Sequence, residues 1–267
     1  MQVAIATFHR LWTVTRRAYP WTYFASTVLS GSLTIALAYL AFQAVGPDGV
    51  SQEFATITGS AHYVGYVAVG AVMYTFAVRL ILWTAKALIT EEREGTFVAL
   101  VVAPARRMPY LLGFVAFAVL STLAEAGAIA AVSVTLGVTI PAPDPVGLAI
   151  AIVVFVVALF AMSLVLGAVM LIASEAHISQ NTVFLLMALI CGFTFPREYL
   201  PLAAQWLAEA LPVTAALDIV RAALSGDFDL ARMSSRLVAG LSVSAAYLVV
   251  GLWLLPRAER RTVKRTS

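Results

Sequence analysis

Long apolar runs are the feature of this sequence that most constrains its fold. Between residues 21 and 255, stretches rich in Leu, Val, Ile, Ala and Phe follow one another with short polar connections. A helix needs ~20 apolar residues to cross the hydrocarbon core of a bilayer, and several runs reach that length. Mean hydropathy is +0.93, and only 12% of the residues are charged. The sequence therefore predicts an all-α integral membrane protein.

Six membrane-spanning helices are expected within residues 21–255. Their approximate bounds are 21–45, 62–82, 108–140, 146–173, 181–195 and 237–255. The third run is longer than one crossing requires, so we expect it to be tilted or broken near Gly127. The fifth is barely long enough to cross. Because the spans consume most of the 267 residues, any energy-converting domain must be a separate polypeptide.

The two ends of the chain are amphipathic or basic. Within residues 1–20, Phe8, Leu11 and Trp12 recur at helical spacing, and Arg10 and Arg17 lie away from that stripe. This pattern predicts a helix lying in the membrane interface, with a frayed tail as the alternative. No signal-peptide pattern is present, so the N-terminus is expected to be retained. Residues 256–267 form a basic tail.

The distribution of basic residues predicts the orientation. Six spans place both termini on one side of the membrane. Thirteen Lys and Arg residues then belong to that side, against four on the other. Arg79 is counted with the thirteen, because near the end of the second span its side chain can reach the head groups. The positive-inside rule therefore places the N- and C-termini in the cytoplasm.

The most charged internal segment, residues 79–107, lies between the second and third runs. Gly95 can end the helix that continues from the second run, and Thr96 can cap a new one that Pro104 stops. The apolar face of this short helix, 96–103, would consist of Phe97, Leu100 and Val101. Charged residues flank it: Glu91, Glu92, Glu94, Arg106 and Arg107. Such a helix suits a groove on a partner protein, and the alternative is a helix lying on lipid.

The segment after the fifth run is broken by prolines. Pro196 and Pro201 interrupt it, and two short helical patterns follow at 202–211 and 213–224, separated by Pro212. We expect these to be half-inserted helices at the membrane edge.

Glu125 is the one charged residue deep inside a predicted span. A charge is costly in lipid and faces protein or a wet cavity. Its functional interpretation is a polar contact on the substrate route or at a dimer seam. In the alternative it lies near a break in the third run, hydrogen-bonded to backbone without a specific role.

Other chemistries find little support. The two lysines, Lys86 and Lys264, follow Ala and Val, so a P-loop for ATP is absent. The histidines are far apart and predict no zinc site. No Gly-x-Ser-x-Gly elbow is present, and no basic, aromatic-interleaved face suggests nucleic acid. We therefore expect no catalytic residue, metal or cofactor in this chain, and we interpret the single cysteine, Cys191, as a packing residue.

Two stretches resemble motifs of the ABC type-2 exporter permeases. The first is EGTFVALVVAP, from Glu94 to Pro104, followed by Ala-Arg-Arg. The second starts with FPREYLP, continues through Leu-Pro-Val-Thr and ends with Arg221. The motifs occur in the expected order, and the six-span layout agrees with them. The resemblance covers essentially the whole chain.

The resemblance implies a half-transporter in the bacterial cytoplasmic membrane, which pairs with a second permease chain and two cytoplasmic ATPases that bind ATP and Mg. Residues coupling it to the ATPase would be Glu94, Gly95, Thr96, Phe97, Leu100, Val101, Pro104 and Arg106. The outer gate would be formed by Phe195, Pro196, Leu200, Pro201, Pro212 and Arg221. The expected activity is export of an amphipathic, lipid-like or drug substrate by alternating access. A proton-coupled transporter using Glu125, or a membrane scaffold, are the alternatives.

Overall fold

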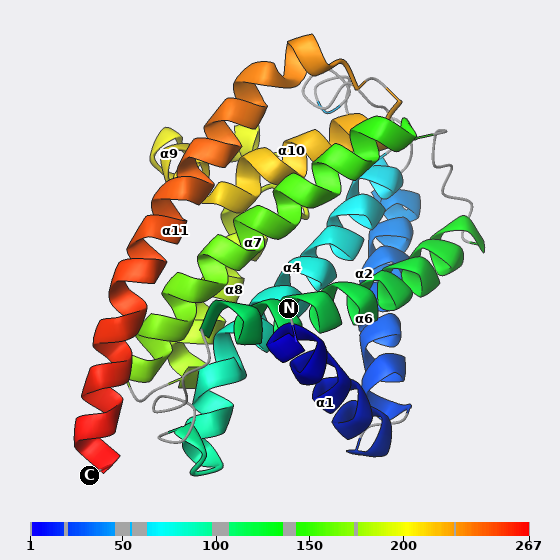
Figure 1. Ribbon diagram of the computed structural model, residues 1–267. Coiled ribbons are helices and arrows are strands. Elements are labelled where there is room, and N and C mark those ends of the chain that lie inside the picture. Colours follow the sequence, from blue (N-terminus) through cyan, green and yellow to red (C-terminus); the bar gives the residue numbers. More distant parts are fainter. Residues whose placement is uncertain are drawn as a thin grey trace.

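The computed structural model describes residues 2–18, 21–45, 54, 63–97, 107–135, 143–173, 176–226 and 228–266. All regular elements in these residues are helical (Figure 1). The longer helices are α1 (Gln2–Ala18), α2 (Thr22–Val45), α4 (Tyr63–Arg93), α6 (Arg107–Thr135), α7 (Pro145–Ala173), α8 (Ala176–Ile190) and α11 (Leu230–Thr266). Short elements between α8 and α11 are η2 (Arg197–Tyr199), α9 (Leu202–Glu209) and α10 (Pro212–Leu224).

The helices confirm an α-helical membrane protein. Among the described residues, α4, α6, α7 and residues 230–263 of α11 are long and apolar enough to cross a membrane. Shorter apolar stretches lie in α2, at Phe24–Leu37, and in α8, at Ile178–Ile190. Helix α8 has 15 residues, which at ~1.5 Å per residue is shorter than a ~30 Å hydrocarbon core. The count of six spans therefore remains a prediction.

Several helix bounds differ from the predicted ones. Helix α6 runs without interruption through Gly127, so the predicted break there is wrong. Helix α8 ends at Ile190 instead of reaching Phe195, because Gly192 takes a φ of 82° and the chain bends. Helix α11 continues through Pro256, so the basic tail described up to Thr266 is helical.

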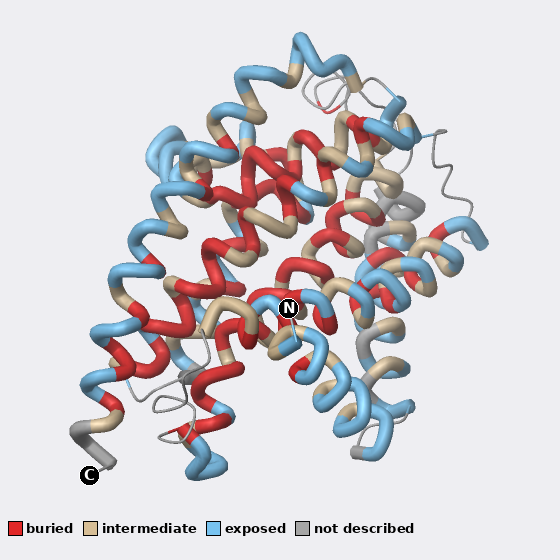
Figure 2. The backbone as a smooth tube through the Cα atoms, viewed as in Figure 1, coloured by how far each residue is buried: buried red, intermediate tan, exposed pale blue. Residues whose placement is uncertain are grey.

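Helix α7 lies at the centre of the packing. It contacts α4, α10 and α11, and much of its length is buried (Figure 2). Ala151, Phe155 and Leu159 on it are completely buried. Asp144 caps its start, because the carboxylate accepts hydrogen bonds from the backbone N–H groups of Val146 and Gly147 at 3.3 and 2.8 Å. The most apolar of these helices is thus packed against several others, as burial of apolar surface requires.

Helix α1 packs on α6 at Gly113. A Cβ at this position would meet Ala4 and Thr7 within 2.7 Å, so only glycine permits the close approach. The rings of Phe8 and Phe117 extend the contact edge to face, with centroids 6.1 Å apart. Trp12 is 48% exposed and lies off this face. Of the predicted apolar stripe of α1, Phe8 therefore packs on the protein itself, whereas Trp12 does not.

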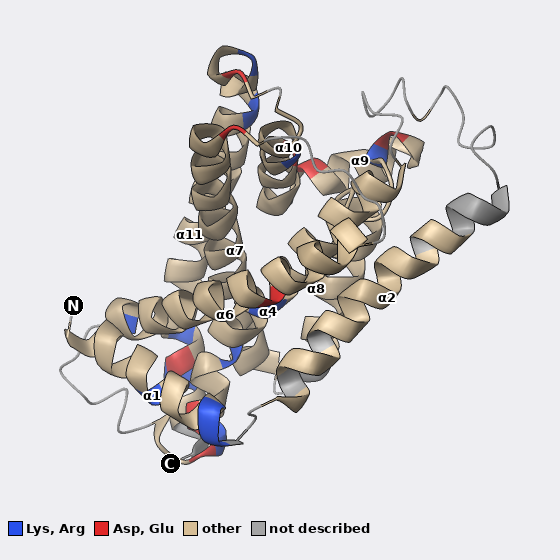
Figure 3. Cartoon of the chain, turned by 90° about the vertical axis from the view of Figure 1, so that its right-hand side faces the viewer, with Lys and Arg blue, Asp and Glu red and all other residues tan. Residues whose placement is uncertain are grey.

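Charged residues gather at the two ends of the bundle. Helix α1 and the C-terminal end of α11 lie toward one end, and α9 and α10 lie toward the other (Figures 1 and 3). The middle is largely uncharged, except where α4 meets α6 (Figure 3). This arrangement divides the candidate site into an elbow at the first end, a charged pair in the middle and an anchored loop at the second end.

Candidate functional site

The elbow after α4 is held together by its own backbone. Helix α4 ends at Arg93, and Gly95 takes the left-handed φ of 74° that favours glycine. The Thr96 N–H donates to the Glu91 carbonyl at 2.9 Å, closing the turn. Helix α4 thus continues beyond the second apolar run and ends just before Gly95, as the sequence predicts, so the elbow is the end of one continuous helix.

Glu91 is the central residue of the elbow. Its carboxylate is buried, with the residue 4% exposed. It accepts hydrogen bonds from the Arg10 guanidinium at 2.7 Å, the Tyr110 hydroxyl at 2.9 Å and the Thr96 hydroxyl. The hydrogen bond to Glu91 raises the pKa of Arg10, whose guanidinium also contacts Glu94 at 3.2 Å. One carboxylate thus joins α1, α4 and α6.

The sequence does not predict this hub, because in the sequence Glu91 is only one of the charged residues that flank the short helix. The partners Arg10 and Tyr110 are 81 and 19 residues away in sequence. The available signal was the position of Glu91 on the same α4 face as buried Leu88 and Ala87.

Replacement of Arg10 tests whether the hub holds α1 in place. We expect Arg10→Gln to speed amide hydrogen exchange in α1, because Glu91 loses its charged donor. The cost should be under ~1 kcal/mol, since Arg10 is half exposed. Arg16→Gln, which removes an exposed charge from the same helix, is the matched control. Equal exchange in both variants would show that packing on α6 alone holds α1.

The predicted coupling residues are placed in part. Glu94, Gly95 and Thr96 are exposed at the tip of the elbow. Phe97 is 3% exposed and belongs to the main hydrophobic core. The expectation that the Phe97 ring is exposed for a partner is therefore wrong. Burying an apolar ring within the chain lowers the free energy relative to leaving it in water. Four further residues lie outside the described part of the chain: Leu100, Val101, Pro104 and Arg106.

Glu125 forms a buried ion pair with Arg79. The Arg79 Nε lies 3.3 Å from Glu125 Oε2, and the Glu125 side chain is 4% exposed. Arg79 is near the middle of α4, so the prediction that it reaches the head groups at the helix end is wrong. Without Arg79, twelve basic residues still belong to the side predicted to be cytoplasmic, against four on the other. Two interpretations of Glu125 were open from the sequence. The ion pair with Arg79 excludes the one in which Glu125 is hydrogen-bonded to backbone alone.

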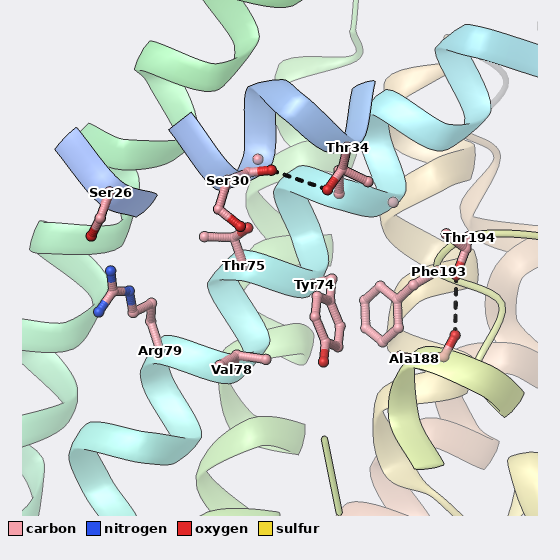
Figure 4. Close-up of a pocket in the computed structure, with 13 residues that line it drawn as sticks. Ser26, Ser30, Thr34, Tyr74, Thr75, Val78, Arg79, Ala188, Phe193 and Thr194 are labelled. Atoms are coloured by element: carbon pink, nitrogen blue, oxygen red, sulfur yellow. Dashed lines mark hydrogen bonds between the residues drawn. The ribbon is translucent and has the colours of Figure 1, made fainter. Parts of the chain in front are cut away.

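A cavity of about 460 Å³ lies beside this pair, between α2, α4 and the segment after α8 (Figure 4). Arg79 lines it, together with hydroxyl-bearing and small residues. The lining comprises Ser26, Ser30, Gly31, Thr34, Gly70, Ala71, Tyr74, Thr75, Val78, Arg79, Ala188, Phe193 and Thr194. A signal for this cavity is present in the sequence of α2, where Ser26, Ser30 and Thr34 recur every four residues on one helix face.

The proline-rich segment at the other end forms short helices, as predicted. Pro196 and Pro201 precede η2 and α9, and Pro212 is the first residue of α10. Pro196 is buried, whereas Phe195 and Leu200 are partly buried. An ion-pair cluster links these elements to α11: Arg197 lies 2.9 Å from Asp218 and 3.4 Å from Glu209, which Arg236 also contacts at 2.9 Å.

Arg221 anchors the bent segment after α8. Its guanidinium donates to the carbonyls of Tyr66, Gly192 and Phe193 at 3.1, 2.9 and 3.2 Å. It also lies over the Tyr66 ring, 3.5 Å from the centroid, in a cation–π contact. Three carbonyls from two separate segments thus share one cation. Because Phe193 and Thr194 line the cavity, Arg221 fixes one of its walls.

The fold and these sites define a polytopic α-helical membrane protein with a charged elbow at one end and a cavity within the bundle. The ABC-2 type transporter family model matches residues 5–225. The chain belongs to this family of transport permeases. Membership makes it the membrane subunit of a transporter and implies ABC ATPase partners. No significant match to a curated protein was found.

Proposed function

We propose that the chain is the permease subunit of an ABC exporter, which moves an amphipathic substrate out of the cytoplasm or inner leaflet. Separate ATPase subunits drive alternating access, and a second permease chain completes the transporter. The chain supplies the path and the coupling surface and performs no chemistry. Its termini lie in the cytoplasm.

The hub at Glu91 carries the proposal. A force applied by an ATPase at the tip of the elbow reaches α4 directly and reaches α1 and α6 through hydrogen bonds to one carboxylate. Helix α4 continues from that tip to the cavity, where it contributes Arg79. The same helix therefore links the docking surface to the proposed substrate route, which is what alternating access requires.

The tip of the elbow offers a direct test of docking. Arg93 is exposed there and follows the last buried turn of α4. We expect Arg93→Glu to weaken co-purification with the ABC ATPase by tenfold or more, on the order of 1.4 kcal/mol, because a charge is reversed at the contact. The chain itself should fold normally, because the replaced side chain is in water.

The control is Arg232→Glu, which reverses an 80% exposed charge in the first turn of α11. It should leave ATPase binding unchanged. Equal binding of the ATPase to both variants would contradict docking at the elbow. Substrate flux driven by a proton gradient in the purified chain alone would contradict ATP-driven export.

A further inference from the structure

We propose that the cavity between α2, α4 and the segment after α8 binds an amphiphile with an acidic, hydroxyl-bearing head group, anchored by Arg79. The inference rests on the proposed transport function and assigns a substrate class to it. Three observations lead to that chemistry: the size of the cavity, the direction of the ion pair beside it and the hydrogen-bonding state of its hydroxyls.

The cavity has the size of a small-molecule site. Its volume of about 460 Å³ falls within the ~300–1,000 Å³ of ligand pockets. The apolar part of its wall includes Ala71, Val78 and Phe193, which suit a hydrocarbon or ring. The Phe193 ring packs edge to face on Tyr74, with centroids 5.4 Å apart (Figure 4). This wall is therefore well defined before a ligand enters.

The ion pair turns its positive side toward the cavity. Arg79 lines the cavity, whereas Glu125 is 3% exposed and lies behind it on α6. Figure 4 shows the terminal nitrogens of Arg79 on the side of Ser26. A guanidinium carries five N–H donors in a planar fork that matches the oxygens of a carboxylate or phosphate. Glu125 thus offsets the cost of burying the charge, and Arg79 presents donors suited to an anionic oxygen.

The hydroxyls present acceptors. Thr34 donates to the Ser30 carbonyl at 3.0 Å, Tyr74 to the Phe184 carbonyl at 3.2 Å and Thr194 to the Ala188 carbonyl at 3.2 Å. A hydroxyl has one hydrogen and two lone pairs, so these three oxygens retain only acceptor capacity. They match O–H donors of a ligand. The lining as a whole therefore fits a head group with an anionic oxygen and hydroxyls.

Native mass spectrometry of the full-length chain with short-chain lipids tests the assignment. Phosphatidylglycerol carries a phosphate and two hydroxyls. Phosphatidylmethanol carries the phosphate alone, and glucosyl diacylglycerol carries hydroxyls alone. We expect phosphatidylglycerol to bind at least fivefold more tightly than either. Equal affinities for all three, or tighter binding of phosphatidylmethanol, would overturn the head-group assignment.

Two variants locate the site. The double variant Arg79→Gln/Glu125→Gln replaces the ion pair by neutral side chains of similar shape, so no lone charge is buried. We expect it to lose about tenfold in phosphatidylglycerol affinity. Thr34→Val keeps the shape of the side chain and removes the hydroxyl. It should lower the ratio of the phosphatidylglycerol affinity to the phosphatidylmethanol affinity. Arg232→Gln is the control for loss of an exposed charge.

Unchanged phosphatidylglycerol binding in the double variant would overturn the role of Arg79. If the double variant fails to fold, Thr34→Val decides. An unchanged ratio of phosphatidylglycerol to phosphatidylmethanol affinity would overturn binding in this cavity, and a lower ratio would support it. The measurement uses no ATPase. Failure of the head-group assignment is therefore distinct from failure of the coupling proposed above, which the ATPase co-purification tests.

Discussion

Gly70→Ala is expected to lower the unfolding temperature of the purified protein by several degrees. A Cβ on Gly70 would collide with the backbone carbonyl of Phe193 and lie 3.1 Å from an Arg221 nitrogen. Backbone cannot move aside as a flexible side chain can, so α4 and the bent segment must separate. Overpacking of this kind costs ~1–3 kcal/mol, occasionally more. Thermal unfolding in detergent, followed by intrinsic fluorescence, measures it.

Gly127→Ala makes the same substitution in the interior of α6, where nothing lies within 4 Å of the added Cβ. Alanine is the better helix former by ~0.8–1.0 kcal/mol. The unfolding temperature should therefore stay the same or rise. Equal changes in the two variants would mean that the bent segment does not hold its position against α4.

Arg221→Met is expected to have the larger effect of the two main predictions. Methionine keeps the length of the side chain but removes the hydrogen bonds from Arg221 to the carbonyls of Tyr66, Gly192 and Phe193. The Gly192 carbonyl keeps only the Tyr66 hydroxyl as a side-chain donor, at 3.0 Å. A hydrogen bond from a charged group contributes ~1.5–3 kcal/mol, and three such bonds are lost. We therefore expect a loss of at least ~3 kcal/mol in stability, measured by thermal unfolding, with a corresponding fall in the yield of monodisperse protein.

Two controls separate the lost donors from the lost charge. Arg232→Met removes an arginine that is 80% exposed, and surface substitutions stay within ~0.5 kcal/mol. Arg221→Lys keeps the charge but not the planar fork that reaches three acceptors, so it should fall between the wild type and Arg221→Met. Full stability of the methionine variant would refute the anchoring role of Arg221.

The membrane-protein class, the family and most helices could be predicted from the sequence, because they depend on local hydropathy and turn residues. Pro196, Pro201 and Pro212 mark the short helices whichever way the chain packs. The charged contacts could not be predicted in this way. Arg79 is 46 residues from Glu125 in the sequence, and only the crossing of α4 and α6 brings them together. Hydropathy alone placed Arg79 at a helix end.

The burial of Phe97 also could not be predicted from the sequence. Its place on an apolar face beside charged residues is compatible with a surface for a partner or with a core position. The choice depends on whether another part of the chain covers that face. In this structure the core covers Phe97, so the residues that the described tip exposes are polar ones, among them Arg93 and Glu94.

The hub at Glu91 also limits how the elbow can move. Its buried carboxylate takes hydrogen bonds from Arg10 of α1, Tyr110 of α6 and Thr96 of the elbow. Sliding one helix by a fraction of a turn would strip the carboxylate of donors without supplying new ones, and the buried charge makes such intermediate positions costly. We therefore expect the hydrogen bonds between the elbow, α1 and α6 to form or break together. In the transporter proposed above, a movement driven by ATP would then reach α4 in steps rather than gradually.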